Sequence, residues 1–355
     1  MAISVEDPVA PMLAKAVTSL PEPDAVPGGY AYEPKWDGFR GIVYAAGAGL
    51  APGVELGSRG SKMLTRYFPE LTEALAGQLP PGVVLDGEIV VRTGRPGAER
   101  LDWEALSARI HPADSRVRRL AAETPAMFVA FDLLALDGED LLAEPFEERR
   151  RRLEDVLAGA RPPLHLTRLT RDRDVAARWL AEFEGAGLDG VVAKALREPY
   201  APNKRTMLKV KHHRTADVVL LGYRVHKSGS GVGSLLVGLY GDDGTLRNVG
   251  GASAFSDARR RALVEELAPL VERGDDGAPL TGETERSRFS GAKDVSFVRL
   301  RPELVAEVAY DQMEGLRFRH AVQFVRWRPD RQARSCTFEQ LERPTAYDLE
   351  GVLQA

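Results

Sequence analysis

The chain is poor in cysteine, in long apolar runs and in excess positive charge. Its one cysteine in 355 residues, Cys336, excludes an intramolecular disulfide and cannot build a structural zinc site alone. No stretch approaches the roughly 18 consecutive apolar residues of a membrane span. Glu6 and Asp7 stand where a signal peptide would be basic and then apolar. These absences predict a cytoplasmic protein with no membrane partner.

The net charge of -4 argues weakly against a nucleic acid partner, because lysine and arginine hold the phosphate backbone. The distribution of charge matters more than its sum. Residues 204–227 contain seven lysines and arginines against Asp217, and residues 317–334 contain six arginines against Asp330. Either tract alone is explained by a solvated surface, so the two tracts permit nucleic acid binding without establishing it.

The length predicts two domains. Residues 1–28 are rich in proline and small residues and are expected to form an extended arm. Residues 29–213 alternate between strand-like and helical patterns, which predicts a mixed α and β domain. The expected strands are 29–34, 82–92, 127–136 and 189–195, and the expected helices are 69–77, 147–158 and 174–185. The polar run 211–217 is the expected hinge, with the domain boundary near residue 213.

Residues 214–355 are expected to form a second domain. Short strands are predicted at 218–225, 235–240, 246–249, 304–310 and 322–328, with one helix at 257–273. The sequence Asp242-Asp243-Gly244 predicts a hairpin turn between the second and third of these strands. About five strands and one helix are the inventory of a small oligonucleotide-binding barrel, the OB-fold.

The stretch from Glu33 to Arg40 is the most informative part of the sequence. It places Lys35 at the end of a strand, Asp37 and Gly38 just after it, and Arg40 five positions on. A lysine in this position is presented to a ligand rather than buried. An ordinary surface lysine near a turn is the alternative explanation for the motif alone.

Further motifs follow in a fixed order. They are Ser58-Arg59-Gly60, Leu85-Asp86-Gly87-Glu88-Ile89, Phe131-Asp132-Leu133-Leu134, Asp189-Gly190-Val191-Val192-Ala193-Lys194, Leu208-Lys209-Val210-Lys211 and Phe324-Val325-Arg326-Trp327-Arg328-Pro329-Asp330. With this series the chain resembles the covalent nucleotidyltransferases: ATP-dependent DNA ligases, RNA ligases and messenger RNA capping enzymes. The likeness covers nearly the whole chain and is greatest to small bacterial ATP-dependent ligases of the ligase C type. The family usually continues its last motif with Asp-Lys, whereas this chain has Asp330-Arg331.

The resemblance implies an α+β fold, with a nucleotidyltransferase (adenylation) domain followed by a C-terminal OB-fold β-barrel. It also implies three phosphoryl transfers in one site. Lys35 attacks the α-phosphate of ATP, AMP passes to a 5′-phosphate, and a 3′-hydroxyl displaces AMP to seal the nick. Cations around Lys35 would favour its neutral, nucleophilic form and neutralise charge on the phosphoryl oxygens.

The resemblance also implies roles for the other motif residues. Glu33 would receive the adenine amino group, Phe131 would stack on adenine, Arg40 would hold ribose or phosphate, and Arg59 would hold the 5′-phosphate; Lys194, Lys209 and Lys211 would supply positive potential, and Arg326 and Arg328 would orient pyrophosphate. Glu88 and Asp189 are hard oxygen donors that suit Mg²⁺ or Mn²⁺. Asp86 is expected to hold a turn instead.

The function predicted is therefore sealing of 5′-phosphate/3′-hydroxyl nicks in duplex DNA by a monomer, in repair, beside a separate repair polymerase or nuclease. An RNA ligase or capping-type guanylyltransferase is the first alternative, and the nucleotide chosen at Glu33 discriminates it. A catalytically dead nucleic-acid-binding module is the second alternative. The retention of Lys35, Glu88 and the three motif lysines argues against that module.

Overall fold

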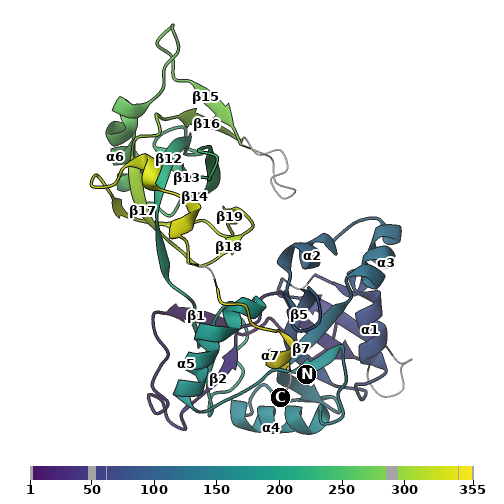
Figure 1. Ribbon diagram of the computed structural model, residues 1–355. Coiled ribbons are helices and arrows are strands. Elements are labelled where there is room, and N and C mark those ends of the chain that lie inside the picture. The colour runs from purple at the N-terminus through teal and green to yellow at the C-terminus, as the bar shows by residue number, and fades with distance from the viewer. Residues whose placement is uncertain (1–2, 47–52, 61, 285–294, 343, 354–355) are drawn as a thin grey trace. The chain divides into compact units, whose positions relative to one another are not determined.

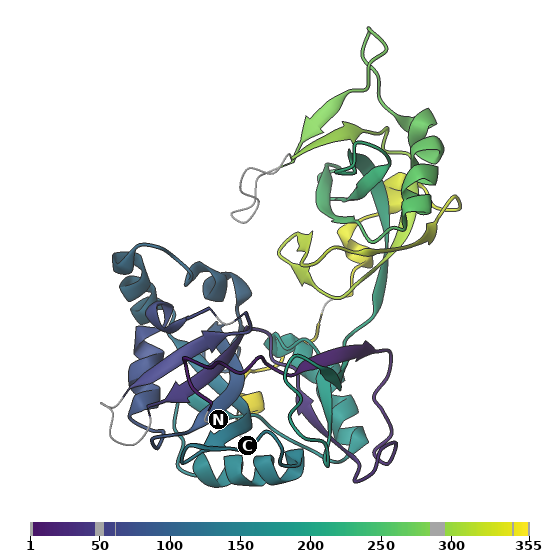
Figure 2. The same cartoon turned by 180° about the vertical axis from the view of Figure 1, so that it is seen from behind.

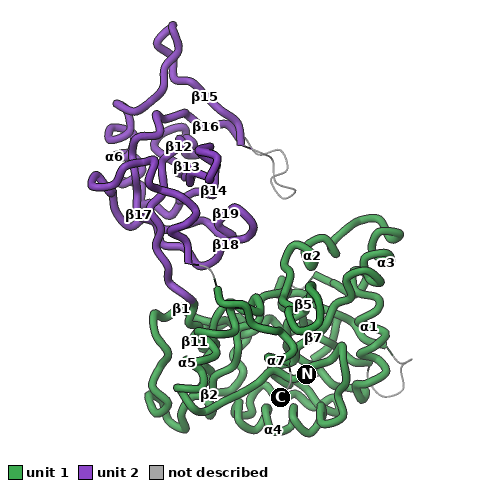
Figure 3. Tube along the Cα trace, viewed as in Figure 1, with its two compact units in different colours: residues 1–211, 344–355 green, residues 212–343 purple. Residues whose placement is uncertain are grey.

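The computed structural model describes residues 3–46, 53–60, 62–284, 295–342 and 344–353. Its chain path is drawn in Figure 1 and, from behind, in Figure 2. The chain divides into two compact units, residues 1–211 with 344–355 and residues 212–343 (Figure 3). We call them unit 1 and unit 2. Among the described residues, no helix has the length and apolar character to cross a membrane.

Unit 1 is built on two sheets. The first has the strand order β1-β11-β10-β2, and these strands are Leu13–Val17, Arg205–Val210, Val191–Ala195 and Tyr30–Pro34. The second has the order β4-β3-β5-β7-β8, with β6 beside β5 and β9 beside β7. Its strands are β3 (Phe39–Ala45), β4 (Val54–Ser58), β5 (Val84–Thr93), β6 (Arg100–Leu101), β7 (Ala126–Leu136), β8 (Glu139–Asp140) and β9 (Leu164–Leu166).

Helices cover these sheets. They are α1 (Pro69–Ala76), α2 (Trp103–Ala108), α3 (Asp114–Glu123), α4 (Phe146–Val156), α5 (Arg173–Glu182) and α7 (Glu350–Leu353). The helix α4 packs against β7, and α5 packs against β2 and β10. Strand β7 is buried along almost its whole length, which explains its nearly continuous apolar sequence. Asp172 caps the start of the helix α5, where its carboxylate accepts hydrogen bonds from the amides of Asp174 and Val175.

Within its described residues, unit 2 consists of a curled seven-stranded sheet, a small two-stranded sheet and an α-helix that packs on the larger sheet. Its long strand β12 (Arg214–Val225) pairs with β13 on one side and with β17 and then β16 on the other. The remaining elements are β13 (Val232–Tyr240), β14 (Leu246–Ala252), α6 (Asp257–Leu267), β15 (Thr281–Glu283), β16 (Ser296–Arg299), β17 (Val305–Tyr310), β18 (Met313–Glu314), β19 (Arg317–Phe318) and β20 (Gln323–Trp327). The turn predicted at residues 242–244 joins β13 to β14, and Gly244 takes a φ of 72° there.

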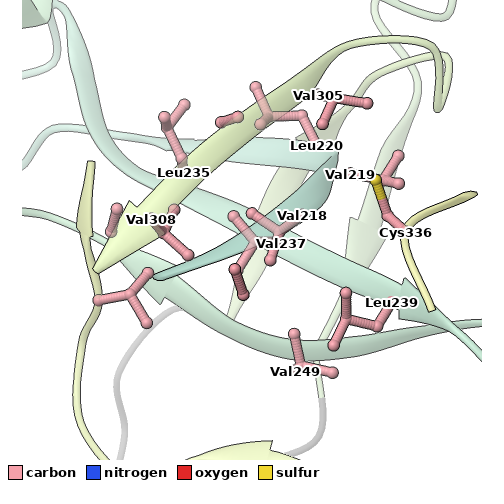
Figure 4. Close-up of a cluster of buried hydrophobic side chains, with 14 of the residues drawn as sticks. Val218, Val219, Leu220, Leu235, Val237, Leu239, Val249, Val305, Val308 and Cys336 are labelled. Atoms are coloured by element: carbon pink, nitrogen blue, oxygen red, sulfur yellow. The ribbon is translucent and has the colours of Figure 1, made fainter. Parts of the chain in front are cut away.

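The core of unit 2 lies inside this curled sheet (Figure 4). Val218 and Leu220 from β12 meet Leu235 and Val237 from β13, and Val308 closes the cluster from β17. Cys336 also lies in this cluster as a free, buried thiol, and burial raises its pKa to about 11. A buried thiol whose pKa is raised in this way stays protonated and unreactive at neutral pH.

The structure corrects three expectations about chain organisation. The arm contains a strand, β1, which pairs in parallel with β11 from Leu13 to Val17. The expected hinge, residues 211–217, is shorter than predicted, because β12 already begins at Arg214 and this residue pairs with Tyr310 of β17. The C-terminal segment, assigned to the barrel, belongs to unit 1 and carries α7, in yellow in Figure 1. Apolar burial explains the last difference, since Leu349 and Val352 are buried in unit 1.

A glycine fixes the loop that leads into β10. Gly190 has a φ of +131°, and a Cβ placed on it would lie 2.0 Å from the Val210 carbonyl oxygen. We expect Gly190→Ala to lower the free energy of unfolding by roughly 2–4 kcal/mol, because it combines backbone strain with a clash. Thermal unfolding followed by circular dichroism measures this loss. Gly159→Ala is the control, because its added Cβ meets no atom within 4 Å. Equal unfolding temperatures for the two variants would contradict the explanation.

Candidate active site

A row of side chains crosses the first sheet of unit 1. The pairing of β2 with β10 sets Glu33 opposite Val192, and the pairing of β10 with β11 sets Val192 opposite Lys209. Opposed residues in neighbouring strands point to the same face of a sheet. All three side chains line a cavity of about 210 Å³. The same cavity is lined by Lys35, Arg40, Arg59, Glu88, Phe131 and Lys194, so the fold gathers the motifs of unit 1 around one space.

Lys35 is held at this cavity by its own backbone and by a carboxylate. Its amide donates to the Gly190 carbonyl at 2.9 Å, and its carbonyl accepts from the Asp189 amide at 2.9 Å. Its Nζ lies 2.6 Å from Asp189 Oδ2, and Lys211 Nζ lies 2.8 Å from the same oxygen. Burial and the nearby charges of Lys35 and Lys211 lower the pKa of Lys209. Two lysines therefore share one carboxylate oxygen, and Lys209 lies close enough to feel their charges.

Glu33 lies at another part of the cavity wall, among buried groups. Its Oε2 is 2.8 Å from Lys194 Nζ, and both side chains are only 3% exposed. Lys194 Nζ also donates to the Phe131 carbonyl at 2.8 Å and lies 4.8 Å from the centre of the Phe131 ring. Lys194 therefore contacts both Glu33 and Phe131. Lys211, by contrast, forms its ion pair with Asp189.

Arg40 is fixed by a buried carboxylate. Its Nε and Nη2 donate to the two oxygens of Asp86 at 2.5 and 2.6 Å, and its guanidinium lies 4.5 Å from the centre of the Phe131 ring. The Tyr200 hydroxyl donates to Asp86 at 2.6 Å and accepts from the Met12 amide at 2.8 Å. Asp86 therefore orients Arg40 from within β5, and its expected role in a turn was wrong because it lies in mid-strand.

Glu88 lies directly opposite Arg40 across the β3 and β5 pairing. Its Oε1 accepts a hydrogen bond from the Gly38 amide at 3.1 Å. Burial raises the pKa of Glu88 to about 7, against the opposing charges of Arg40 and Lys35. Near neutral pH this carboxyl therefore exchanges between a charged form, which can ligate a cation, and a neutral form.

The raised pKa of Glu88 predicts a pH dependence of stability. The folded state binds the proton more tightly than the unfolded state, whose pKa stays near 4.5. The stabilisation by the protonated form is complete below about pH 4.5 and is lost as pH rises through about 7. We expect Glu88→Gln, measured without metal or ATP, to gain at most about 3 kcal/mol over the parent protein between pH 5 and 8. Denaturant unfolding at pH 5 and at pH 8 measures the difference in free energy of unfolding between the two proteins. The same difference at both pH values would contradict the prediction.

Arg59 is exposed just beyond β4 and lines two cavities. The second cavity, of about 400 Å³, is mostly apolar and includes Leu64 and Ile110. Arg40 and Glu88 line both cavities as well. A guanidinium at the junction suits a phosphate group that passes from one space to the other.

Arg326 and Arg328 lie in unit 2, at and just after the end of β20. Arg326 Nε lies 2.7 Å from Glu307 Oε2, and Arg328 Nη1 lies 3.9 Å from the same oxygen, so both guanidinium groups approach one carboxylate. Arg328 also forms ion pairs with Asp217 and Asp330. Arg331, in the place of the family lysine, lies 3.1 Å from Asp217.

Several residues around the cavity carry no motif signal of their own. The Met12 carbonyl accepts from Arg40, and Tyr200 orients Asp86. Arg149 and Arg150, in the helix α4, reach Asp132 and Glu33. In the sequence both arginines lie in a run of four that reads as a solvated helix face. The one available signal was their spacing beside Phe146 and Leu153, which marks the buried face of that helix.

Comparisons with known proteins show the family to which the chain belongs. The family described as ATP dependent DNA ligase domain matches residues 11–211, and the ATP dependent DNA ligase C terminal region matches residues 228–331. A solved structure of a Lig E DNA ligase superposes with a TM-score of 0.55 at 18% identity, covering 89% of this chain and 99% of that chain. The expected class of fold, a nucleotidyltransferase domain followed by an OB-fold barrel, is thereby confirmed.

Two curated relatives narrow the class. DNA ligase C of Mycobacterium tuberculosis is 53% identical over 368 residues, covering 99% of each chain. DNA ligase C1 of Mycolicibacterium smegmatis is 52% identical over 359 residues, covering 100% of this chain and 99% of the relative. The chain belongs to the ATP-dependent DNA ligases and is a small bacterial enzyme of that family.

The residues around the cavity fit a divalent cation held in part by substrate. Among the described residues, no cluster of three His, Cys, Asp or Glu side chains forms a complete metal cage. Mg²⁺ commonly binds through one or two carboxylates together with substrate phosphates, so it needs no such cage. Glu88 supplies a hard oxygen donor on the cavity wall.

Proposed function

We propose that this ligase seals 5′-phosphate/3′-hydroxyl nicks in duplex DNA through a covalent bond between Lys35 Nζ and AMP. The observation that carries the proposal is the position of Lys35. Its Nζ lies at the cavity, bonded to Asp189, beside the motif lysines Lys209 and Lys211. Cationic groups at this point favour binding of the ATP phosphates and stabilise charge on the α-phosphoryl oxygens during attack.

The cavity supports a division of roles. Glu33 and Phe131 lie together and are proposed to bind the base, while Arg40 and Lys209 bind ribose and phosphate. Lys194 holds Glu33 and the Phe131 backbone in place. Asp189 orients Lys35 and is positioned to accept its proton as the bond to phosphorus forms and the bond to pyrophosphate breaks. Its role as a metal ligand stays a prediction.

A divalent cation, Mg²⁺ or Mn²⁺, is proposed to bind with Glu88 as a ligand, and Asp189 is the second carboxylate named for it. When bound, the cation would neutralise charge on the phosphate oxygens. In unit 2, Arg326 and Arg328 are proposed to orient the pyrophosphate leaving group. The adenylation domain is proposed to comprise residues 29–213 with β1 and the C-terminal helix added, and the OB-fold domain begins at residue 214.

The nicks are proposed to arise in DNA repair, in the cytoplasm of a bacterial cell. The enzyme is proposed to act as a monomer beside separate polymerases or nucleases that prepare the ends. The relative named multifunctional non-homologous end joining DNA repair protein LigD, 35% identical over 314 residues, supports a repair setting. This chain covers 36% of the length of LigD.

The test is a labelling and chase experiment with the purified protein. ATP labelled at the α-phosphate is added with Mg²⁺, and the protein is examined on a denaturing gel. We expect label on the protein, which then leaves to give a sealed strand when nicked duplex DNA is added. Label from GTP in place of ATP, or a chase that works with RNA alone, would support the guanylyltransferase or RNA ligase alternative. Absence of label with either metal would overturn the proposal.

A further inference from the structure

An arginine from the helix α4 approaches the carboxylate proposed to read the base. Arg150 Nη1 lies 3.7 Å from Glu33 Oε1, and the two side chains are 9% and 3% exposed. Within the described part of the chain, both atoms are buried and neither has a hydrogen bond partner. Their attraction is therefore an ion pair between fixed charges, without the geometry of a hydrogen bond.

The guanidinium of Arg150 is held in this direction by its other nitrogens. Its Nη2 donates to the Thr167 carbonyl at 2.9 Å, and its Nε donates to Glu154 at 2.7 Å. The Thr167 hydroxyl in turn accepts a hydrogen bond from the indole of Trp36, the residue after Lys35. Arg150 is thus linked through Thr167 to Trp36, next to the proposed nucleophile Lys35.

Three charged groups face Glu33. They are Lys194 from β10, Arg150 from α4 and Asp132 from β7, and Asp132 is itself paired with Arg149. Burial raises the pKa of Glu33 above its ordinary value, and the charges of Lys194 and Arg150 limit that rise. Lys194 also binds the Phe131 carbonyl, so it has a second task. Arg150 is therefore the cation whose removal changes the charge state of Glu33 without disturbing Phe131 directly.

We propose that Arg150 is a positioning residue that sets base specificity by keeping Glu33 a carboxylate. A carboxylate only accepts hydrogen bonds, whereas a protonated carboxyl also donates one. Adenine carries an amino donor at the ring position where guanine carries a carbonyl oxygen. A charged Glu33 therefore accepts from adenine and repels guanine, and a neutral Glu33 tolerates both. The inference rests on the proposed function, in which Glu33 faces the base of bound ATP.

The experiment compares self-labelling by α-labelled ATP and GTP from pH 5.5 to 8. Arg150→Met removes the charge and keeps an unbranched side chain. We expect its preference for ATP, as a ratio of kcat/KM values, to fall on the order of tenfold at pH 6, because a hydrogen bond to a charged group contributes about that much. The preference should recover as pH rises and Glu33 loses its proton. Arg152→Met is the matched control, because Arg152 lies on the same helix and pairs with Glu148.

Two further variants separate charge from structure. Arg150→Lys keeps the positive charge and should therefore show the same preference for ATP as the parent protein. If Arg150 acted only through the hydrogen bonds of its guanidinium, lysine would not preserve the preference. Glu33→Gln presents an amide donor at every pH, so its preference should be relaxed throughout, and this result does not depend on whether Arg150→Met folds. An unchanged, pH-independent preference in Arg150→Met, or in Glu33→Gln if the first variant unfolds, would overturn the inference. Failure of the parent protein to take label from ATP would instead overturn the proposed function.

Discussion

Lys35→Ala is expected to lose covalent labelling by ATP by a factor of ~10⁴ or more, since removal of a nucleophile leaves no group to form the bond. The neighbouring lysines do not substitute for it. Lys209 lies on β11, two strands away from β2 in the sheet, and Lys211 follows the end of β11, so neither occupies the position of Lys35 just after β2. Label incorporation on a denaturing gel measures the loss.

Lys35→Arg is the matched variant, because arginine keeps the charge but stays protonated and is not a nucleophile. Both variants should bind nicked duplex within about threefold of the parent protein at the same salt concentration, since one charge among many contributes little to affinity. Both should also retain some sealing of a nick whose 5′-phosphate already carries AMP, since that substrate bypasses the lysine. Labelling of either variant at the parent level would remove Lys35 from its role.

The motif residues of unit 1 were predictable because they lie close to one another along short segments. The sequence Glu33-Pro34-Lys35 ends a strand, and the glycines at 38 and 190 allow backbone approaches that any other residue would block. A Cβ on Gly38 would lie 2.1 Å from the Ile89 carbonyl oxygen. The local sequence therefore indicated where Lys35 and Asp189 lie. It did not indicate that one oxygen of Asp189 would form ion pairs with two lysines.

Residues that act from a distance were not predictable. Tyr200 reaches Asp86 across 114 positions of sequence, and Arg150 reaches Glu33 across 117. A tyrosine after a glutamate and a proline, or an arginine in a charged helix, has no local pattern that indicates such a partner. The parallel pairing of β1 with β11 was missed for the same reason, because the strand Leu13–Val17 is short and half exposed.

Asp132→Ala is expected to cost about 3–5 kcal/mol in the free energy of unfolding, because it leaves a buried guanidinium unpaired. Arg149 is fully buried and donates to Asp132 through Nε at 2.7 Å and Nη2 at 3.0 Å. The midpoint temperature of thermal unfolding should fall by roughly 10 °C for a unit of this size. Asp155→Ala, which breaks the exposed pair with Arg151 on the same helix, should change stability by less than about 1 kcal/mol.

The double variant Asp132→Leu with Arg149→Met distinguishes an unpaired charge from lost packing. With both charges removed, most of the stability should return, because the desolvation cost disappears together with the attraction. A double variant as unstable as Asp132→Ala would show that shape rather than charge is decisive here.

Asp132 follows Phe131, whose carbonyl accepts a hydrogen bond from Lys194. The single variant should therefore raise KM for ATP more than it lowers the rate of bond formation at Lys35, since the base end of the cavity loosens first.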